Sequence, residues 1–235
     1  MNTQQHWDDE AAEYDAVMGS DPTIAALHSE IASKLPDPPG PVLDLGCGTG
    51  MLMYRIARQF PDVELIGLDP SANMRALAHQ RLPQAQLLDA SAKEIPLPDH
   101  SMATVISNFA LHHLDHEDKA QCANEVFRVL RPGGVFLFGD QHVQTMGGPS
   151  DSNWQEEVLD LFTEKARFYL RNASPDRMLL QIRLLPRFLT ADGEIPATQE
   201  YWSEQLTRAG LTVEEIVEIA PAHLHNRVIV ARKPL

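Results

Sequence analysis

The chain of 235 residues has few cysteines, few aromatic residues and no long apolar run. Its two cysteines, Cys47 and Cys122, lie far apart in apolar segments, so we expect buried free thiols and a reducing, cytoplasmic environment. No segment reaches the ~18 consecutive apolar residues of a membrane span. The polar, acidic N-terminal sequence also lacks the basic start and apolar stretch of a secretion signal.

Basic residues are also scarce, since 19 Lys and Arg stand against 33 Asp and Glu and leave a formal net charge of −14. Such a charge repels nucleic acid backbones and anionic lipid surfaces, so we expect neither as a general partner. Hydrophobic residues make up 43% and charged residues 22%, as in ordinary globular proteins. The length favours one domain that carries a sizeable insertion.

Short apolar runs alternate with longer amphipathic stretches, a pattern typical of a parallel sheet with helices on both faces. The predicted strands are 42–45, 63–68, 85–88, 103–108, 135–139, 211–219 and 227–232. Only a short turn-bearing stretch separates the last two strands, so we expect them to pair antiparallel at the sheet edge. The predicted fold class is α/β.

Four parts follow from this pattern within a single domain. Residues 1–36 form an N-terminal helical lid, 40–140 the core that binds a ligand, 141–198 a helical cap insertion, and 199–235 a helix followed by a β-hairpin. In the lid, Trp7 and Tyr14 are expected on the inner face, where their aromatic area would exclude water.

The sharpest motif is a glycine loop, Gly46-Cys47-Gly48-Thr49-Gly50, directly after a predicted strand and directly before a predicted helix. Glycine permits the turn and a close approach of a ligand to the backbone. The unpaired amides at the helix start favour an electronegative group such as a carboxylate or a ribose oxygen. A dinucleotide fingerprint would need a small residue where this chain has Met51.

Two acidic residues end the next two predicted strands. Asp69 lies about 20 residues beyond the glycines, where a carboxylate can accept both hydroxyls of a ribose. Asp89 precedes Ala90, and this pair is placed to contact an adenine through a carboxylate and a backbone amide. The sequence therefore predicts a site for an adenine nucleoside.

Over residues 40–140 the chain resembles the class I S-adenosylmethionine-dependent methyltransferases. The resemblance rests on residues 42–50, on Asp69 and Asp89, and on the segment 128–134, Arg-Val-Leu-Arg-Pro-Gly-Gly. It implies a Rossmann-like, seven-stranded, mostly parallel sheet with an antiparallel last strand, and S-adenosylmethionine as cofactor with S-adenosylhomocysteine as product. The cofactor-binding residues that we expect are Asp44, Gly46, Cys47, Gly48, Gly50, Asp69, Pro70, Met74, Asp89, Ala90 and Asn108.

Two adjacent histidines, His112 and His113, follow the fourth predicted strand, whose carboxyl end faces the transferring methyl in this fold. A neutral imidazole is suited to take a proton from an acceptor, so both are candidate catalytic residues. Asp140 and His142 form a second candidate polar pair. No histidine spacing matches a zinc signature, so no metal is expected.

The cap has its own signals. Its aromatic residues either line an acceptor pocket or form the core of the cap; they are Trp154, Phe162, Phe168 and Tyr169. Its positive charge would suit an acidic acceptor but is also explained by solvated helix faces; it comes from Arg167, Arg171, Arg183 and Arg187.

The leading hypothesis is a methyltransferase that modifies an O, N or C atom of a small molecule, similar to those of ubiquinone and menaquinone biosynthesis, and acts as a monomer or homodimer. Three alternatives remain. An acyl-carrier-protein O-methyltransferase is one, although that type usually has Gln-Trp at 112–113. A tRNA wobble-uridine methyltransferase is another, although the net charge of −14 disfavours RNA. The third is a non-catalytic module that only binds the cofactor.

Overall fold

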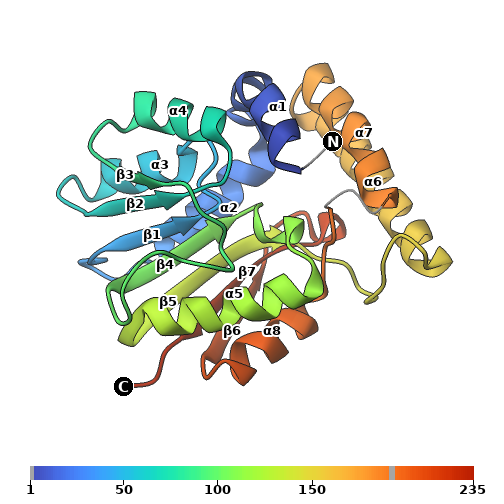
Figure 1. Cartoon of the computed structure of the whole chain (residues 1–235). Coiled ribbons are helices and arrows are strands. Elements are labelled where there is room, and N and C mark those ends of the chain that lie inside the picture. The colour runs from blue at the N-terminus through green and yellow to red at the C-terminus, as the bar shows by residue number, and fades with distance from the viewer. Residues whose placement is uncertain (1–2, 191–193) are drawn as a thin grey trace.

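The computed structural model describes the backbone of residues 3–190 and 194–235, and a single seven-stranded sheet runs through its centre (Figure 1). The strands are β1 (Val42–Leu45), β2 (Leu65–Leu68), β3 (Gln86–Leu88), β4 (Met102–Asn108), β5 (Leu130–Gln141), β6 (Thr212–Glu218) and β7 (Asn226–Arg232). All seven predicted strands are present. Strands β1, β2, β4, β5 and β7 are largely buried apolar runs, whereas the edge strand β6 is mostly exposed.

The strand order is β3-β2-β1-β4-β5-β7-β6. Strands β1 to β5 pair in parallel, whereas β7 is antiparallel to both β5 and β6. The predicted Rossmann-like sheet with its terminal antiparallel hairpin is thus confirmed. The order reverses between β1 and β4, and this switch point is where ligands bind in open α/β sheets.

Eight α-helices surround the sheet in the described parts of the chain. They are α1 (Thr3–Met18), α2 (Pro22–Ser33), α3 (Met51–Gln59), α4 (Ala72–Arg81), α5 (His116–Val129), α6 (Ser152–Asn172), α7 (Pro175–Leu189) and α8 (Gln199–Arg208). Helices α5 and α8 pack on one face through residues such as Val126 and Trp202. Helices α2 and α3 cover the other face through Ile31 and Ile56.

The insertion forms a pair of helices, α6 and α7, that lies beside α1 at the carboxyl edge of the sheet (Figure 1). Trp154 and Phe162 of α6 pack with Phe188 of α7 in a small core of the pair. Leu180 of α7 packs with Met18 at the end of α1. None of the described helices has the length and apolarity needed to cross a bilayer.

Two local features differ from the sequence-based expectation. Helix α7 was not predicted as an element, because Pro175 and Pro186 interrupt its pattern; the structure places Pro175 in its first turn and Pro186 within it. Strand β5 begins at Leu130 rather than Val135, and its pairing with β4 shifts register between Met102 and Thr104. The Pro-Gly-Gly segment therefore belongs to an irregular start of the strand.

Candidate active site

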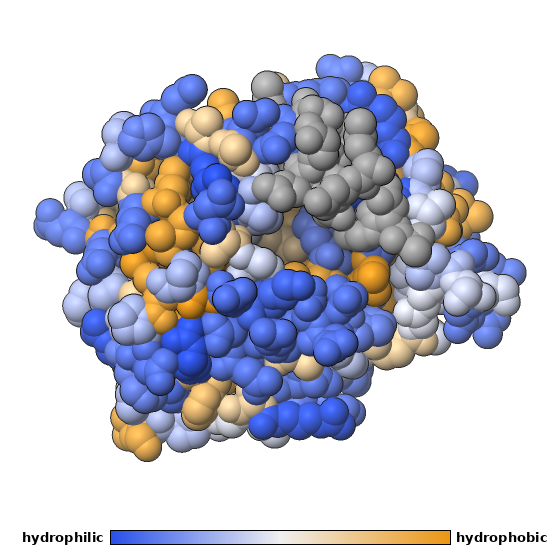
Figure 2. Space-filling view, viewed as in Figure 1, coloured by the Kyte–Doolittle hydropathy of each residue, from blue (hydrophilic) through white to orange (hydrophobic). Residues whose placement is uncertain are grey.

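A cavity of about 550 Å³ lies at the switch point between β1 and β4. The loops that follow these two strands touch there, since a Cβ atom on Gly46 would come within 2.3 Å of the Cβ of Ala110. Gly46 also has a positive φ of 68°, so glycine is required at this position for both reasons. On the face of the molecule in Figure 2, the surface is hollowed above the hydrophilic outer side of α5.

Gly48 forms the open part of the glycine loop. Its φ is 52°, and a Cβ atom built on it would meet nothing within 4 Å, because it lines the cavity. The backbone here thus leaves space for a ligand to approach closely. Gly50 plays a different part, since it caps α3 in a left-handed conformation and packs against Ala78, outside the cavity lining.

Two buried carboxyls, Asp44 at 2% exposure and Asp69 at 8%, line the cavity beside this loop. The amide of Gly48 donates to Asp69 Oδ2 at 2.8 Å, and the amide of Ser71 donates to Oδ1 at 2.9 Å. Burial raises the pKa of both carboxyls, and the charge of Asp69 raises the pKa of Asp44 further. A positively charged ligand would relieve this repulsion.

Asp15 connects helix α1 to the glycine loop through hydrogen bonds and an ion pair. The Thr49 hydroxyl donates to Asp15 Oδ1 at 2.5 Å, and the Arg81 guanidinium donates to both Asp15 oxygens at 2.8 and 2.9 Å. Nearer the start of α1, Asp8 accepts a hydrogen bond from the Ser71 hydroxyl at 2.6 Å. These contacts hold the N-terminal helix over the loops that follow β1 and β2.

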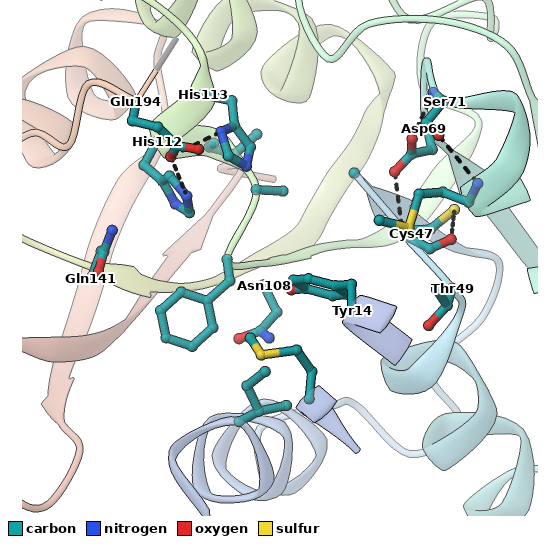
Figure 3. A pocket seen from close by; sticks show the side chains of 18 of the residues that line it. Tyr14, Cys47, Thr49, Asp69, Ser71, Asn108, His112, His113, Gln141 and Glu194 are labelled. Carbon is teal, nitrogen blue, oxygen red and sulfur yellow. Dashed lines mark hydrogen bonds and ion pairs between the residues drawn. The ribbon is translucent and has the colours of Figure 1, made fainter. Parts of the chain in front are cut away.

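Across the cavity, His112 is buried between the carboxylates of Asp140 and Glu194, and Figure 3 shows its contact with Glu194. Its Nδ1 lies 2.7 Å from Asp140 Oδ1, and its Nε2 lies 3.3 Å from Glu194 Oε2. Burial alone would lower the pKa of His112, but the charges and hydrogen bonds of Asp140 and Glu194 outweigh it and raise the pKa to about 9. The same imidazole holds the pKa of Asp140 below its usual range despite complete burial.

Glu194 joins both histidines, because its Oε2 also lies 3.2 Å from His113 Nδ1. Its other oxygen, Oε1, faces Arg187 Nε at 3.5 Å. Burial would raise the pKa of Glu194, but His113 and His112 lower it well below its usual range. The carboxylate is therefore ionised and held at the cavity wall, with 1% of its surface exposed.

The cap contributes a buried cation, Lys165, to the cavity wall. Its ammonium donates to Gln141 Oε1 at 2.5 Å and lies 3.4 Å from Asn226 Oδ1, and both of these partners are neutral. Burial, reinforced by the charge of Arg177, lowers the pKa of Lys165 to about 7. Arg177 differs, since it is paired with Asp21 at 2.5 Å.

The structure brings most of the predicted site residues to this one cavity. The lining includes Asp44, Gly46, Cys47, Gly48, Asp69, Pro70, Met74, Asn108, His112 and His113. Asp89 and Ala90 lie outside it; Asp89 is a 68% exposed side chain paired with Arg75, and Ser91 and Ala92 line the wall instead.

Other predicted residues take supporting positions. Asp140 bonds to His112, and the Nδ1 of His142 lies 3.3 Å from the Ala197 carbonyl oxygen, while Gln141 between them lines the cavity. Tyr14 also lines the cavity, whereas the side chain of Trp7 lies outside the described residues.

Sequence reasoning missed Glu194 and Lys165. Glu194 lies far along the chain from the histidines, and its position depends on a hydrogen bond from the Ile195 amide to the His112 carbonyl at 2.8 Å. Lys165 left one signal, a lysine among apolar positions of the α6 pattern. That spacing does not predict that Lys165 lines the cavity or that it binds Gln141.

Comparison with known proteins identifies the domain. Residues 42–134 match the methyltransferase domain family. A demethylmenaquinone methyltransferase of Lactiplantibacillus plantarum is 34% identical over 171 residues, which cover 69% of this chain and 63% of that protein. An uncharacterized methyltransferase of Oceanobacillus iheyensis is 35% identical over 44% of this chain and 48% of its own length. The chain spans about half the length of the first curated relatives that it matches.

Solved structures share the fold along nearly the whole chain. A SAM-dependent methyltransferase from Thermotoga maritima has a TM-score of 0.64 at 16% identity and covers 97% of both chains. One from Mesorhizobium loti has a TM-score of 0.61 at 24% identity, with 87% of this chain and 96% of that chain covered. The sheet order, the glycine loop and these matches agree: residues 42–134 form a methyltransferase domain, and the chain has the fold of S-adenosylmethionine-dependent methyltransferases.

Proposed function

We propose that this protein transfers the methyl group of S-adenosylmethionine to a small molecule held in the cavity between the sheet and the cap. The observation that carries the proposal is the continuity of the cavity, whose lining includes both the Gly48–Asp69 side and the His112–His113 side. Figure 3 shows Asn108 and Tyr14 between these two groups. One ligand on each side would thus meet near the end of β4.

The residues on the first side fit the cofactor. The open space at Gly48 admits a ligand to the backbone, and Asp69 retains acceptor capacity for ribose hydroxyls beyond its two amide bonds. Asp44, buried beside Asp69, favours a cationic methionine end. S-adenosylmethionine supplies a methyl group on a positively charged sulfur, which is the electrophile of the reaction. Pro70, Met74 and Cys47 would complete the wall, and Asp89 with Ala90 would contact the adenine from the edge.

On the second side, the chain would position the acceptor and receive its proton. Phe109, Phe162 and Phe188 line the cavity and exclude water from the reacting groups. Of the two histidines, both ring nitrogens of His112 lie against carboxylates, whereas the side chain of His113 is more exposed, at 21% against 9%. We therefore favour His113 as the proton acceptor and His112 as the residue that orients the loop.

A small-molecule acceptor suits both the cavity of about 550 Å³ and the name of the Lactiplantibacillus plantarum relative. A tRNA acceptor would have to approach a protein of net charge −14, and an acyl-carrier-protein acceptor would require entry of a tethered chain. A non-catalytic module would bind the cofactor without turnover. The same assay separates all four.

The test follows radioactive methyl from S-adenosylmethionine into the small-molecule, RNA and protein fractions of a cell extract. We expect label in the small-molecule fraction, with turnover about 10²- to 10⁴-fold lower in His113→Ala and cofactor affinity nearly unchanged. Label in the RNA or protein fraction would identify one of the alternatives. Binding of S-adenosylhomocysteine without label in any fraction would contradict catalysis.

A further inference from the structure

We propose that His112, His113 and Glu194 form a binding site for one divalent transition-metal ion, with an open coordination position toward the cavity. One ring nitrogen from each histidine and one oxygen of Glu194 lie within 4.8 Å of one another. No spacing rule reveals such a site, because its third ligand comes from a distant segment of the chain.

Two of the three distances between the ligand atoms match a metal polyhedron. Glu194 Oε2 lies 3.3 Å from His112 Nε2 and 3.2 Å from His113 Nδ1. Bonds of about 2.0 to 2.1 Å to a tetrahedral zinc ion place neighbouring ligand atoms about 3.3 Å apart. By strict geometry the same oxygen has no hydrogen-bond partner among the described residues, although both imidazoles lie within ion-pair distance of it. A shared cation would take the place of these two contacts.

The surroundings of the cluster are those of a supported ligand set. His112 donates its Nδ1–H to Asp140 at 2.7 Å, which orients the ring so that Nε2, once an ion displaces its proton, can bind that ion beside Glu194. Carboxylates commonly hold metal-binding histidines in this way. Glu194 is fixed by its neighbour Ile195, whose amide bonds to the His112 carbonyl and whose carbonyl accepts from Lys119 Nζ at 2.7 Å.

The donor types select the class of ion. Two imidazoles and one carboxylate suit Zn²⁺, Fe²⁺ or Co²⁺, whereas Mg²⁺ and Ca²⁺ prefer oxygen ligands. Three protein ligands leave a position for a further ligand, as in catalytic rather than structural zinc sites. All three residues line the cavity, so that position would face the acceptor.

This part of the inference rests on the proposed function and concerns the acceptor. An acceptor hydroxyl bound to the ion would lose its proton to solvent more readily, because the cation stabilises the oxyanion that attacks the methyl carbon. The oxygen–carbon bond forms as the carbon–sulfur bond breaks, and the sulfur keeps the electron pair. The histidines would then act as ligands, and the acceptor would carry a hydroxyl or enol group.

The first experiment titrates untagged, chelator-treated protein with Zn²⁺ by calorimetry and with Co²⁺ by visible absorption at neutral pH. We expect one ion per chain, an affinity at least about 100-fold weaker in Glu194→Gln, and an affinity about 10- to 100-fold weaker in Asp140→Asn. His79→Gln, which changes an exposed histidine on α4, is the matched control and should bind as wild type does.

Acetohydroxamate, a small oxygen chelator, probes the open position. Its addition should change the visible spectrum of the Co²⁺ protein, and an unchanged spectrum would overturn the open position. Equal Zn²⁺ affinity in wild type and Glu194→Gln would overturn the site and leave only an ion-pair cluster. S-adenosylhomocysteine binding is measured on the same samples, so that failure of the metal site and failure of the proposed cofactor site are distinguished.

Discussion

The guanidinium of Arg81, at the end of α4, donates to both carboxylate oxygens of Asp15 on α1, at 2.8 and 2.9 Å. The hydroxyl of Thr49 donates to the same carboxylate, so three segments meet over the glycine loop. The order of the glycine loop is thereby coupled to the docking of the N-terminal helix. The first prediction tests this coupling.

We expect Asp15→Ala to weaken S-adenosylhomocysteine binding about three- to tenfold, because a partly exposed ion pair and the hydrogen bond of Thr49 are both lost. Calorimetry measures the affinity. Asp160→Ala, an exposed acidic residue on α6, has the same change of charge and should leave it unaltered. Equal affinities in both variants would show that α1 does not support the loop.

The second prediction separates the two acids that the sequence assigned to the nucleoside. Asp69→Asn should weaken S-adenosylhomocysteine binding about 10- to 150-fold, because hydrogen bonds to a charged group contribute roughly 1.5 to 3 kcal/mol. Asp89→Asn should cost less than about 1 kcal/mol, since Asp89 is exposed and already paired with Arg75. Affinities in the reverse order would move the ribose contact to Asp89.

The sequence predicted the central strands because they are largely buried apolar runs, and it predicted the exposed edge strand β6 from its place beside the last strand. It predicted that His112 and His113 lie at the carboxyl edge of the sheet, because they follow the buried strand β4. Glu194 could not be placed, because its position depends on tertiary contacts. Asp89 was correctly placed at a strand end, but its side chain is exposed and pairs with Arg75 instead of lining the cavity. The end of a strand does not determine which way a side chain points.

The third prediction concerns the pH dependence of cofactor binding. Burial and the charge of Asp69 hold the pKa of Asp44 well above its ordinary value, so a proton competes with a cationic ligand. The affinity for S-adenosylmethionine should therefore rise with pH until the Asp44 carboxyl is fully ionised in the free protein, and binding should release protons. Calorimetry in buffers of different ionisation enthalpy counts them.

Asp44→Asn is the informative variant for this titration. It should bind S-adenosylmethionine more weakly and with fewer protons released, because the residue no longer ionises. Proton release equal to that of wild type would assign the titration to another group, and Asp69 is then the first candidate.

The last prediction concerns Lys165, whose ammonium is buried against the neutral oxygens of Gln141 and Asn226. Burial and the charge of Arg177 lower its pKa to about 7, well below the usual value of about 10.4. Between about pH 10 and pH 7 the unfolded chain therefore takes up a proton that the folded chain does not. This lysine makes the protein less stable as the pH falls through that range.

Lys165→Met should accordingly raise the free energy of unfolding at neutral pH by about 1 to 4 kcal/mol, the range seen when buried ionic groups are replaced by apolar side chains. The gain should shrink toward about pH 10, where folded and unfolded lysine are both neutral. Urea unfolding at the two pH values measures it, with the partly exposed Lys34→Met as control. A gain that is the same at both pH values would mean that Lys165 is charged in the folded protein. The anion that would then have to balance it is best sought in the acceptor, because Lys165 lines the cavity.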